Sequence, residues 1–241
     1  MKAMILAAGL GTRLGEIGKE TPKILLDING KTVLERIVDN LILYGFNDII
    51  INIHYLADQV ISAVRDLNER KNAEIIISDE RDELLETGGG LYKAREYFGD
   101  EPFLVCNGDI LTDLDLGKMY DYHVRKKALS TIAVRHREGN RAFLIDKEGI
   151  IRGWTNRQSG VDIISIEEPM ELEEIPSMAI TVYDHGIFDY MEAGKYTMTS
   201  IILKATASER VICFKYNRGY WIDIGSPEKL QEARDLLATL A

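Results

Sequence analysis

Hydrophobic residues in the first half of the chain alternate between short continuous runs and helical spacing. The continuous runs predict buried strands at residues 2–8, 47–53, 73–78 and 102–106. Apolar positions three and four residues apart predict helices at residues 32–44, 56–67 and 89–98. Residues 47–53, taken as one unbroken apolar run, are typical of a strand that is covered on both faces.

The second half of the chain has a less regular pattern. Apolar residues predict strands at residues 128–135, 161–166, 177–183 and 210–216, and a hairpin at residues 142–155. Helices are expected at residues 186–191, 198–206 and 227–240. Ser226 would cap the last helix, with Pro227 at its first position. Residues 167–174 are acidic and contain proline, which predicts a solvated loop.

The order of these elements predicts an α/β fold in one domain, residues 1–241. We expect a Rossmann-like, mostly parallel sheet flanked by helices, with a smaller second lobe. Ligands of such sheets gather beyond the carboxyl ends of the strands. The loop around Gly9, residues 88–90 and residues 107–109 all follow predicted strands. We therefore expect these three segments to contribute to one site.

Composition narrows the class of partner. The chain has 46% hydrophobic residues and a formal net charge of −10, which argues against nucleic acid or an anionic membrane as the main partner. Cys106 and Cys213 lie in apolar runs and predict buried thiols in a reducing compartment. We recognise no signal peptide and no membrane-spanning run, so a cytoplasmic protein is expected.

Residues 8–23, AGLGTRLGEIGKETPK, carry the most specific pattern. Gly9 and Gly11 follow the first predicted strand, and backbone N–H groups can close on an anion where no Cβ intervenes. Arg13 and Lys23 add two cations that can reach the same point. A dinucleotide fingerprint needs a third glycine and a Walker loop ends in Gly-Lys-Ser/Thr, so neither pattern fits. The segment predicts a cradle for a polyphosphate.

Residues 7–14 and 22–25 resemble the start of the sugar nucleotidyltransferases (NDP-sugar pyrophosphorylases), which reads AAGxGTRL followed by PKxL. The resemblance covers nearly the whole chain. It implies a Mg²⁺-dependent enzyme that condenses a nucleoside triphosphate with a sugar 1-phosphate, giving an NDP-sugar and pyrophosphate. It also implies a nucleotide-binding half, residues 1–126, and a sugar-phosphate-binding half, residues 127–241.

The resemblance assigns roles to individual residues. Arg13 and Lys23 would be catalytic, Arg13 on the leaving β and γ phosphates and Lys23 at the reacting centre. Asp109 and Asp223 would share one Mg²⁺, which suits the preference of this ion for one or two carboxylates; from the sequence alone, Asp109 is also compatible with a turn or capping role. The nucleotide would also contact Ala8, Gly9, Gly11, Thr12, Thr87 and Gly88. The sugar phosphate would contact Glu86, Asn107 and Asn156.

Residues 86–90, ETGGG, look most like the branch that uridylylates N-acetylmuramate 1-phosphate in cell-wall sugar metabolism, which favours UTP. Three glycines at the start of a helix indicate a close approach to the backbone, and Thr87 could cap that helix. Where many relatives carry Glu-Lys-Pro, this chain has residues 153–158. Asn156 or Arg157 would replace that lysine, or the segment is only the edge of a hairpin.

Other functions stay open at this stage. A guanylyl- or cytidylyltransferase for a mannose, heptose or choline phosphate would share the same opening motif. A non-catalytic homologue that binds nucleotide sugars should have lost one of Arg13, Lys23, Asp109 or Asp223, and all four are present. An NAD-dependent dehydrogenase is disfavoured by the missing third glycine. The oligomeric state is not predicted.

Overall fold

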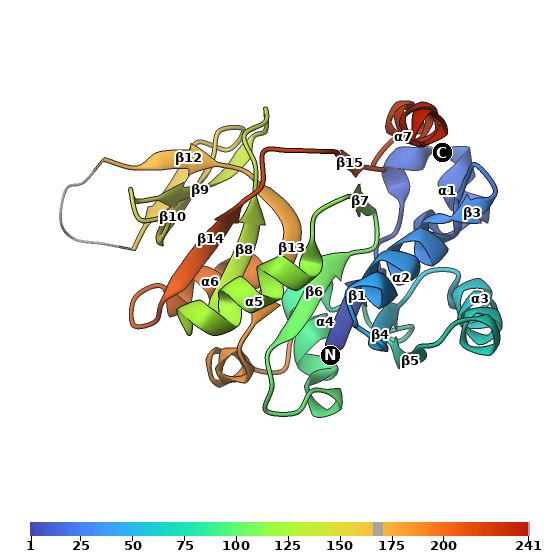
Figure 1. Ribbon diagram of the computed structural model, residues 1–241, viewed down its shortest axis with the longest axis horizontal. Helices are drawn as coiled ribbons and strands as arrows, with labels where there is room; N and C mark the ends of the chain where they lie inside the picture. The colour runs from blue at the N-terminus through green and yellow to red at the C-terminus, as the bar shows by residue number, and fades with distance from the viewer. Residues whose placement is uncertain (166–170, 241) are drawn as a thin grey trace. The chain divides into compact units, whose positions relative to one another are not determined.

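The structure is a computed structural model that describes residues 1–165 and 171–240 (Figure 1). Its contacts divide the chain into two compact units. Unit 1 consists of Met1–Glu86, Cys106–Asp115 and Gly219–Ala241, and unit 2 consists of Thr87–Val105 and Leu116–Arg218. The units are interleaved along the chain, so they do not follow the expected boundary at residue 126. The assignment of nucleotide and sugar phosphate to the two halves stays a prediction.

The main sheet of unit 1 is parallel. Strand β1 (Lys2–Leu6) pairs with β4 (Asp48–Ile53), and β4 pairs with β5 (Glu74–Asp79). The connecting helices α2 (Val33–Leu43) and α3 (Ala57–Arg70) each bury one apolar stripe. The Thr32 hydroxyl accepts a hydrogen bond from the Glu35 N–H and so caps α2. The strands and helices predicted for residues 2–78 are confirmed within three residues.

Several short elements and the C-terminal helix complete unit 1. They are η1 (Thr12–Leu14), α1 (Glu16–Glu20), η2 (Lys23–Leu25), β2 (Asp27–Ile28), β3 (Lys31–Thr32), β7 (Ile110–Thr112), β15 (Trp221–Asp223) and α7 (Pro227–Thr239). Strand β15 pairs with β7 in antiparallel register, and α7 contacts β2 (Figure 1). Ser226 caps α7 as predicted. Hydrophobic periodicity did not predict the paired strands β7 and β15, because three residues are too few to show a period.

Unit 2 contains one group of three paired strands and a separate four-stranded sheet. In the first, β8 (Ser130–Val134) pairs in parallel with β14 (Val211–Lys215) and antiparallel with β13 (Ser177–Tyr183). The second has the order β11-β10-β9-β12. Its strands are β9 (Arg141–Ile145), β10 (Ile151–Asn156), β11 (Val161–Ile164) and β12 (Glu173–Ile175). Strands β9 and β10 form the predicted hairpin.

The remaining elements of unit 2 include one helix that the sequence analysis did not predict. Helix α5 (Leu116–Lys126) buries only Leu116, Met119 and His123, so its apolar stripe is thin. The others are α4 (Glu86–Lys93), η3 (Arg95–Tyr97), β6 (Phe103–Asn107), η4 (His185–Tyr190) and α6 (Met198–Ala205). Helix α4 begins three residues earlier than predicted at residue 89. The last two residues of β6 belong to unit 1.

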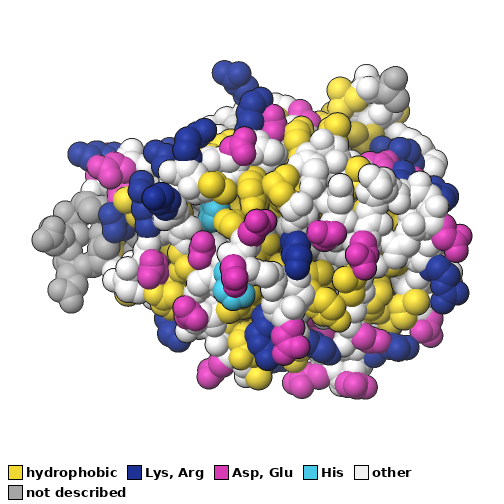
Figure 2. Space-filling view, turned by 60° about the horizontal axis from the view of Figure 1, so that its bottom comes forward, with side chains coloured by type: hydrophobic (Ala, Val, Ile, Leu, Met, Phe, Trp, Pro, Cys, Tyr) yellow, Lys and Arg dark blue, Asp and Glu magenta, His cyan; other side chains and the backbone are white. Residues whose placement is uncertain are grey.

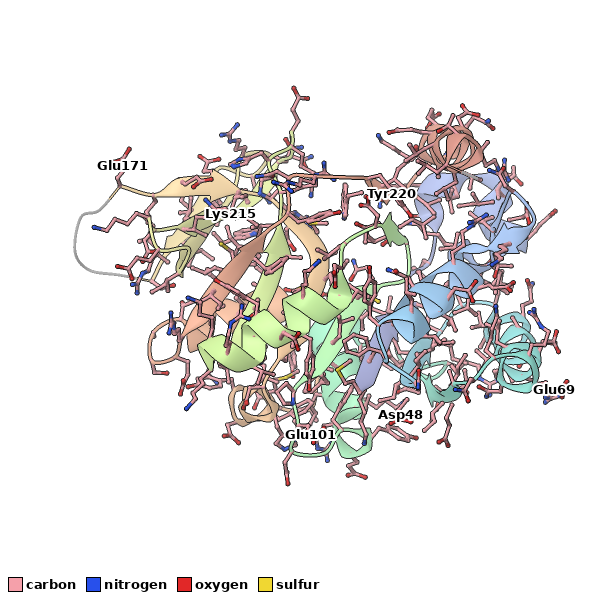
Figure 3. All side chains as sticks on the ribbon, in the orientation of Figure 1. Asp48, Glu69, Glu101, Glu171, Lys215 and Tyr220 are labelled. Carbon is pink, nitrogen blue, oxygen red and sulfur yellow. The ribbon has the colours of Figure 1, made fainter. Side chains whose placement is uncertain are left out.

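The acidic segment 167–174 is only partly described, and its described end differs from the predicted loop. Residues 166–170 lie outside the described residues. Glu173 and Glu174 belong to β12, which pairs with β9, and both carboxylates have basic partners there. Glu173 pairs with Lys215 at the end of β14 (2.7 Å; Lys215 is labelled in Figure 3), and Glu174 pairs with Arg157 (2.7 Å).

Both cysteines are free and buried, as predicted. Burial raises the pKa of the Cys106 thiol to about 12 and that of the Cys213 thiol to about 11, which keeps both protonated at neutral pH. Among the described residues, we find no helix with the length and apolar character needed to cross a bilayer. Figure 2 shows Lys and Arg side chains interspersed with Asp and Glu over one face.

His123 is the one buried histidine in the described part of the chain, with 1% of its surface exposed. Its Nδ1 lies 2.9 Å from the Thr131 hydroxyl, and burial lowers the pKa of its imidazole from 6.5 to about 4, with Asp184 opposing part of the shift. At a pH between these two pKa values, His123 is protonated in the unfolded chain and neutral in the folded protein. Stability is therefore lost as the pH falls from about 6.5 towards 4.

We predict that His123→Gln flattens this dependence. Going from pH 7 to pH 4.5, the free energy of unfolding of the wild type should fall by roughly 2 to 3 kcal/mol more than that of the variant. Urea unfolding at both pH values measures the difference. Equal losses in the two proteins would show that His123 does not resist protonation.

Candidate active site

The glycine-rich loop after β1 is shaped by its own backbone. Gly11 and Gly15 have positive φ angles of 62° and 60°, which favour glycine, and the Leu14 N–H donates to the Gly11 carbonyl (3.0 Å). A Cβ on Gly18 would lie 2.5 Å from that same carbonyl oxygen, so glycine at position 18 lets α1 pack against the loop. A Cβ on Gly9 would meet no atom of the described residues within 4 Å, its two chain neighbours aside. The protein itself therefore does not require glycine at position 9, and its expected role towards a phosphate stays a prediction.

Arg13 lies in η1 and its guanidinium reaches the segment that follows β15. A Cβ on Gly225 would lie 2.9 Å from Nη1 of Arg13 and 2.7 Å from Oδ1 of Asp223. Gly225 therefore leaves room for the guanidinium and the carboxylate side by side. The Trp-Ile-Asp-Ile-Gly pattern of residues 221–225 contains this glycine, but its packing role was not predicted.

Lys23 forms the central ion pair of unit 1. Pro22 precedes η2 with φ −54°, which fixes the start of this short helix. The Lys23 Nζ donates to Oδ2 of Asp109 (2.5 Å) and lies 3.9 Å from Oδ1 of Asp223. The side chains of Lys23 and Asp109 are only 16% and 21% exposed, so solvent screens their attraction weakly. The structure thus brings together three of the residues that the sequence analysis named.

The two aspartates are positioned by adjacent strands. Asp109 joins β6 to β7, and its carbonyl accepts from the Ile224 N–H (2.9 Å). Asp223 ends β15 opposite Ile110 of β7. At the other end of this ladder, the Thr112 hydroxyl donates to the carbonyl of Tyr220 (2.8 Å; labelled in Figure 3). Residues more than a hundred positions apart are therefore held at fixed register.

Gly108 fixes the position of Asp109 against β1. Its N–H donates to the Leu6 carbonyl (2.8 Å), and a Cβ would lie 2.9 Å from Cδ1 of Ile24 and 3.0 Å from the same carbonyl. A side chain at position 108 would therefore require the Ile24 side chain and the end of β1 to shift. Asn107, the last residue of β6, is partly buried at the same end of the sheet.

The donor set of this cluster suits a hard divalent cation. Oδ1 of Asp109 is buried and has no hydrogen-bond partner in residues 1–165 and 171–240. A buried carboxylate oxygen without a partner is costly unless a cation or proton satisfies it. The same ranges contain no group of three or more His, Cys, Asp or Glu side chains arranged to hold a metal. A two-carboxylate site fits Mg²⁺ completed by water and phosphate oxygens, and does not fit a closed zinc site.

Within unit 2, Tyr196 packs against the backbone of the first glycines of α4. The N–H groups of Gly88 and Gly89 point at the carbonyl of Tyr196 (2.8 and 3.4 Å). A Cβ on Gly88 would lie within 2.5 Å of the Tyr196 ring and 2.8 Å from that carbonyl oxygen. The predicted close approach to this backbone is real, and the group that approaches it in the structure is Tyr196.

The expectation that Thr87 caps its own helix is wrong. Thr87 lies inside α4, and its hydroxyl accepts from the N–H of Met198, the first residue of α6. Thr87 therefore caps α6, because Thr197 at the N-cap position makes no side-chain cap of its own. Spacing along the chain could not reveal a cap for a helix 111 residues away.

The other predicted sugar-phosphate contacts lie at the ends of elements, Glu86 at the start of α4 and Asn156 at the end of β10. Glu86 is exposed and has a φ of 59°, an uncommon conformation for a non-glycine residue. In unit 2, Oδ1 of Asn156 accepts from the Gln158 N–H (3.1 Å), which shapes the turn after β10. Arg157 pairs with Glu174. Ala8 is buried, whereas Thr12 is exposed.

Two buried polar residues near the loop were not predicted. Asn52 interrupts the apolar strand β4, and Glu80 follows β5; they are 2% and 0% exposed. An amide within a run of isoleucines was the available signal, because a polar side chain in a strand covered on both faces must find a partner.

Known proteins show clear similarity to this chain. The family described as Nucleotidyl transferase matches residues 2–239. The chain is 30% identical to the N-acetylmuramate alpha-1-phosphate uridylyltransferase of Neisseria meningitidis serogroup B, over 98% of each protein. It is also 30% identical, over 99% of its own length, to the UTP–glucose-1-phosphate uridylyltransferase of Synechocystis, of which it spans 64%. The crystal structure of HddC from Yersinia pseudotuberculosis complexed with GMP-PN has a TM-score of 0.79 and 25% identity, covering 98% of this chain and 99% of that one.

We predict that Gly88→Ala destabilises the protein by about 1 to 3 kcal/mol, because the new methyl group overlaps a ring and a carbonyl that cannot both move freely. Gly99→Ala is the matched control: a Cβ there meets nothing within 4 Å, and the change should stay within about 0.5 kcal/mol. Urea unfolding compares the two. Equal stability of both variants would show that Tyr196 does not enforce glycine at position 88.

Proposed function

This chain belongs to the nucleotidyl transferase family and is a sugar-phosphate nucleotidyltransferase, and we propose that it transfers the uridylyl group of UTP to N-acetylmuramate 1-phosphate. An oxygen of the sugar 1-phosphate attacks the α-phosphorus of the triphosphate. The bond from that phosphorus to the bridging oxygen breaks, and pyrophosphate leaves with the electron pair. A cytoplasmic role in cell-wall sugar metabolism, with no nucleic-acid or membrane partner, is part of this proposal.

The observation that carries the proposal is the cluster of Lys23, Asp109 and Asp223, with Arg13 beside it, at the carboxyl end of β1. Arg13 and Lys23 balance the two carboxylates at this point, although the chain as a whole is acidic. Parallel sheets bind ligands at this end of their strands. The cluster therefore lies where two polyanions could be brought together.

Charge is the main obstacle to the reaction, and the basic residues address it. The phosphate nucleophile is already ionised at neutral pH, so no general base is needed. Arg13 would bind the departing β and γ phosphates, and Lys23 would hold phosphate oxygens at the reacting centre. Such groups accelerate the reaction by positioning both substrates and stabilising charge that develops on the leaving group.

Asp109 and Asp223 would hold Mg²⁺, which supplies positive charge against the phosphate oxygens of both substrates. The unpartnered oxygen of Asp109 supports this assignment. Lys23 donates to the other oxygen of Asp109, so it must release that carboxylate in part to reach a phosphate. Its ammonium is held within reach of both carboxylates until substrates enter.

The further substrate contacts belong to the same proposal. Backbone groups of Ala8, Gly9, Gly11 and Thr12 would approach the triphosphate. The N–H of Gly88 donates to the carbonyl of Tyr196, so Gly88 would contact the nucleotide through other atoms, with Thr87 beside it. Glu86, Asn107 and Asn156 would contact the sugar phosphate.

The identity of the base has one specific competitor. The relative from Neisseria meningitidis, similar over nearly its whole length, is a uridylyltransferase, which favours UTP. HddC, with a comparable share of both chains aligned, was solved with GMP-PN, which favours a guanylyltransferase. The ETGGG segment of residues 86–90 supports the uridylyl alternative.

A substrate panel tests the proposal. The protein is incubated with UTP, GTP, CTP, ATP or dTTP and with the 1-phosphates of N-acetylmuramate, glucose or mannose, each with Mg²⁺ or with EDTA, and pyrophosphate release is measured. We expect the highest rate with UTP, N-acetylmuramate 1-phosphate and Mg²⁺. A preference for GTP would establish the guanylyl alternative, and the absence of release from every pair would refute the activity.

Asp109→Asn and Asp223→Asn test the metal assignment in the same assay. Each should lower turnover by about a hundredfold or more while circular dichroism stays unchanged. Asp121→Asn removes an equal charge from an exposed position on α5 and should turn over at the wild-type rate. Full activity in either of the first two variants would exclude a shared metal site.

A further inference from the structure

Asn52 connects the central strand of unit 1 to the start of the glycine-rich loop. Its Oδ1 accepts from the N–H of Ala7 (2.7 Å), the first residue after β1. Its Nδ2 donates to Oε1 of Glu80 (2.7 Å), and this contact is buried. The amide orientation is therefore fixed at both ends, because a flipped amide would face a donor with a donor and an acceptor with an acceptor.

Glu80 organises the segment from residue 80 to residue 86. Its N–H donates to the Ile53 carbonyl (2.8 Å), which extends the pairing of β5 with β4. Its Oε2 accepts from the N–H of Leu85 (3.4 Å), and its carbonyl accepts from the N–H of Glu83 (3.1 Å). The fully buried carboxylate thus closes the loop that ends at Glu86.

These contacts form a continuous chain of hydrogen bonds from Ala7 through Asn52 and Glu80 to Leu85. A buried amide and a buried carboxylate are expensive, and well-packed apolar side chains would commonly be as stable or more stable. The same chain fixes the first peptide of the glycine-rich loop. It also fixes the residue before Glu86, which begins the ETGGG segment.

We propose that Asn52 and Glu80 are a positioning pair that holds the glycine-rich loop and the segment 80–86 in one register, so that the loop and the residues that follow this segment, Thr87 and Gly88, meet the nucleoside triphosphate together. The pair does not touch the reacting atoms. It acts through the peptides of Ala7 and Leu85. This inference rests on the proposed function only for the identity of the ligand.

Glu80→Gln tests the pair with little change of shape. The new side chain can still accept from Asn52 through its oxygen, but it then presents an amide donor to the Leu85 N–H. We expect KM for the triphosphate to rise about tenfold or more and kcat to fall. KM for the sugar 1-phosphate should rise less than KM for the triphosphate, because only Glu86 of its three proposed contacts adjoins the segment that Glu80 holds. A purely structural role would lower stability without this split.

Thr131→Val is the matched control. It removes a comparably buried hydrogen bond, between Thr131 and His123 in unit 2, and should leave all kinetic constants within twofold. Asn52→Leu removes both amide contacts at similar volume. If the pair acts as a unit, Asn52→Leu with Glu80→Gln should lose no more kcat/KM than the more damaging single substitution.

Amide hydrogen exchange provides a readout that does not depend on turnover. In Glu80→Gln, peptides covering residues 6–14 and 80–88 should both exchange faster than in the wild type, whereas Thr131→Val should leave both unchanged. If exchange in residues 6–14 and KM for the triphosphate are both unaffected, the pair does not position the loop. If the wild type releases no pyrophosphate from any substrate pair, the proposed function fails, and hydrogen exchange alone decides this inference.

Discussion

The arrangement of unit 1 depends on holding two carboxylates close to one ammonium. Asp109 and Asp223 come from segments more than a hundred positions apart, and the antiparallel ladder of β7 and β15 pairs Asp223 with Ile110, the residue after Asp109. Two like charges at this separation would repel, and the Lys23 ammonium, 2.5 Å from one and 3.9 Å from the other, offsets that repulsion. The proposed chemistry uses the same balance: a divalent cation and the phosphates of two substrates enter a site whose charges already compensate one another.

Several glycines of this site are explained by packing rather than by flexibility. Gly108 lets the end of β1 lie against the loop that carries Asp109, and Gly225 lets the Arg13 guanidinium lie beside Asp223. Gly88 accommodates Tyr196 in the same way within unit 2. In each case a Cβ would lie within 3 Å of a neighbouring side-chain or backbone atom, so glycine at these positions helps to set the local geometry.

The sequence was sufficient to predict the elements with strong periodicity and the residues within a specific motif. Helix α2, the parallel strands β1, β4 and β5, and the cap at Ser226 follow from local pattern and capping chemistry, and the resemblance implied that Lys23, Asp109 and Asp223 belong together. Strands β7 and β15 are too short to show a period, and the role of Thr87 depends on a helix distant in sequence. Treating residues 47–53 as one apolar run overlooked Asn52, whose partners just after β1 and just after β5 are visible only once the strands are paired.

The affinity of the empty protein for a divalent cation tests the charge balance most directly. Mn²⁺ binding without nucleotide, followed by electron paramagnetic resonance, is compared in the wild type, Lys23→Met and Lys19→Met. At about 4 Å and an effective dielectric of about 20, two unit charges repel by about 4 kcal/mol, and the ammonium opposes a divalent cation by about twice that. Even after screening, Lys23→Met should therefore bind Mn²⁺ about tenfold or more tightly than the wild type. Lys19→Met loses the same charge from an exposed pair with Glu16 and should match the wild type. Unchanged or weaker Mn²⁺ binding by Lys23→Met would contradict the account.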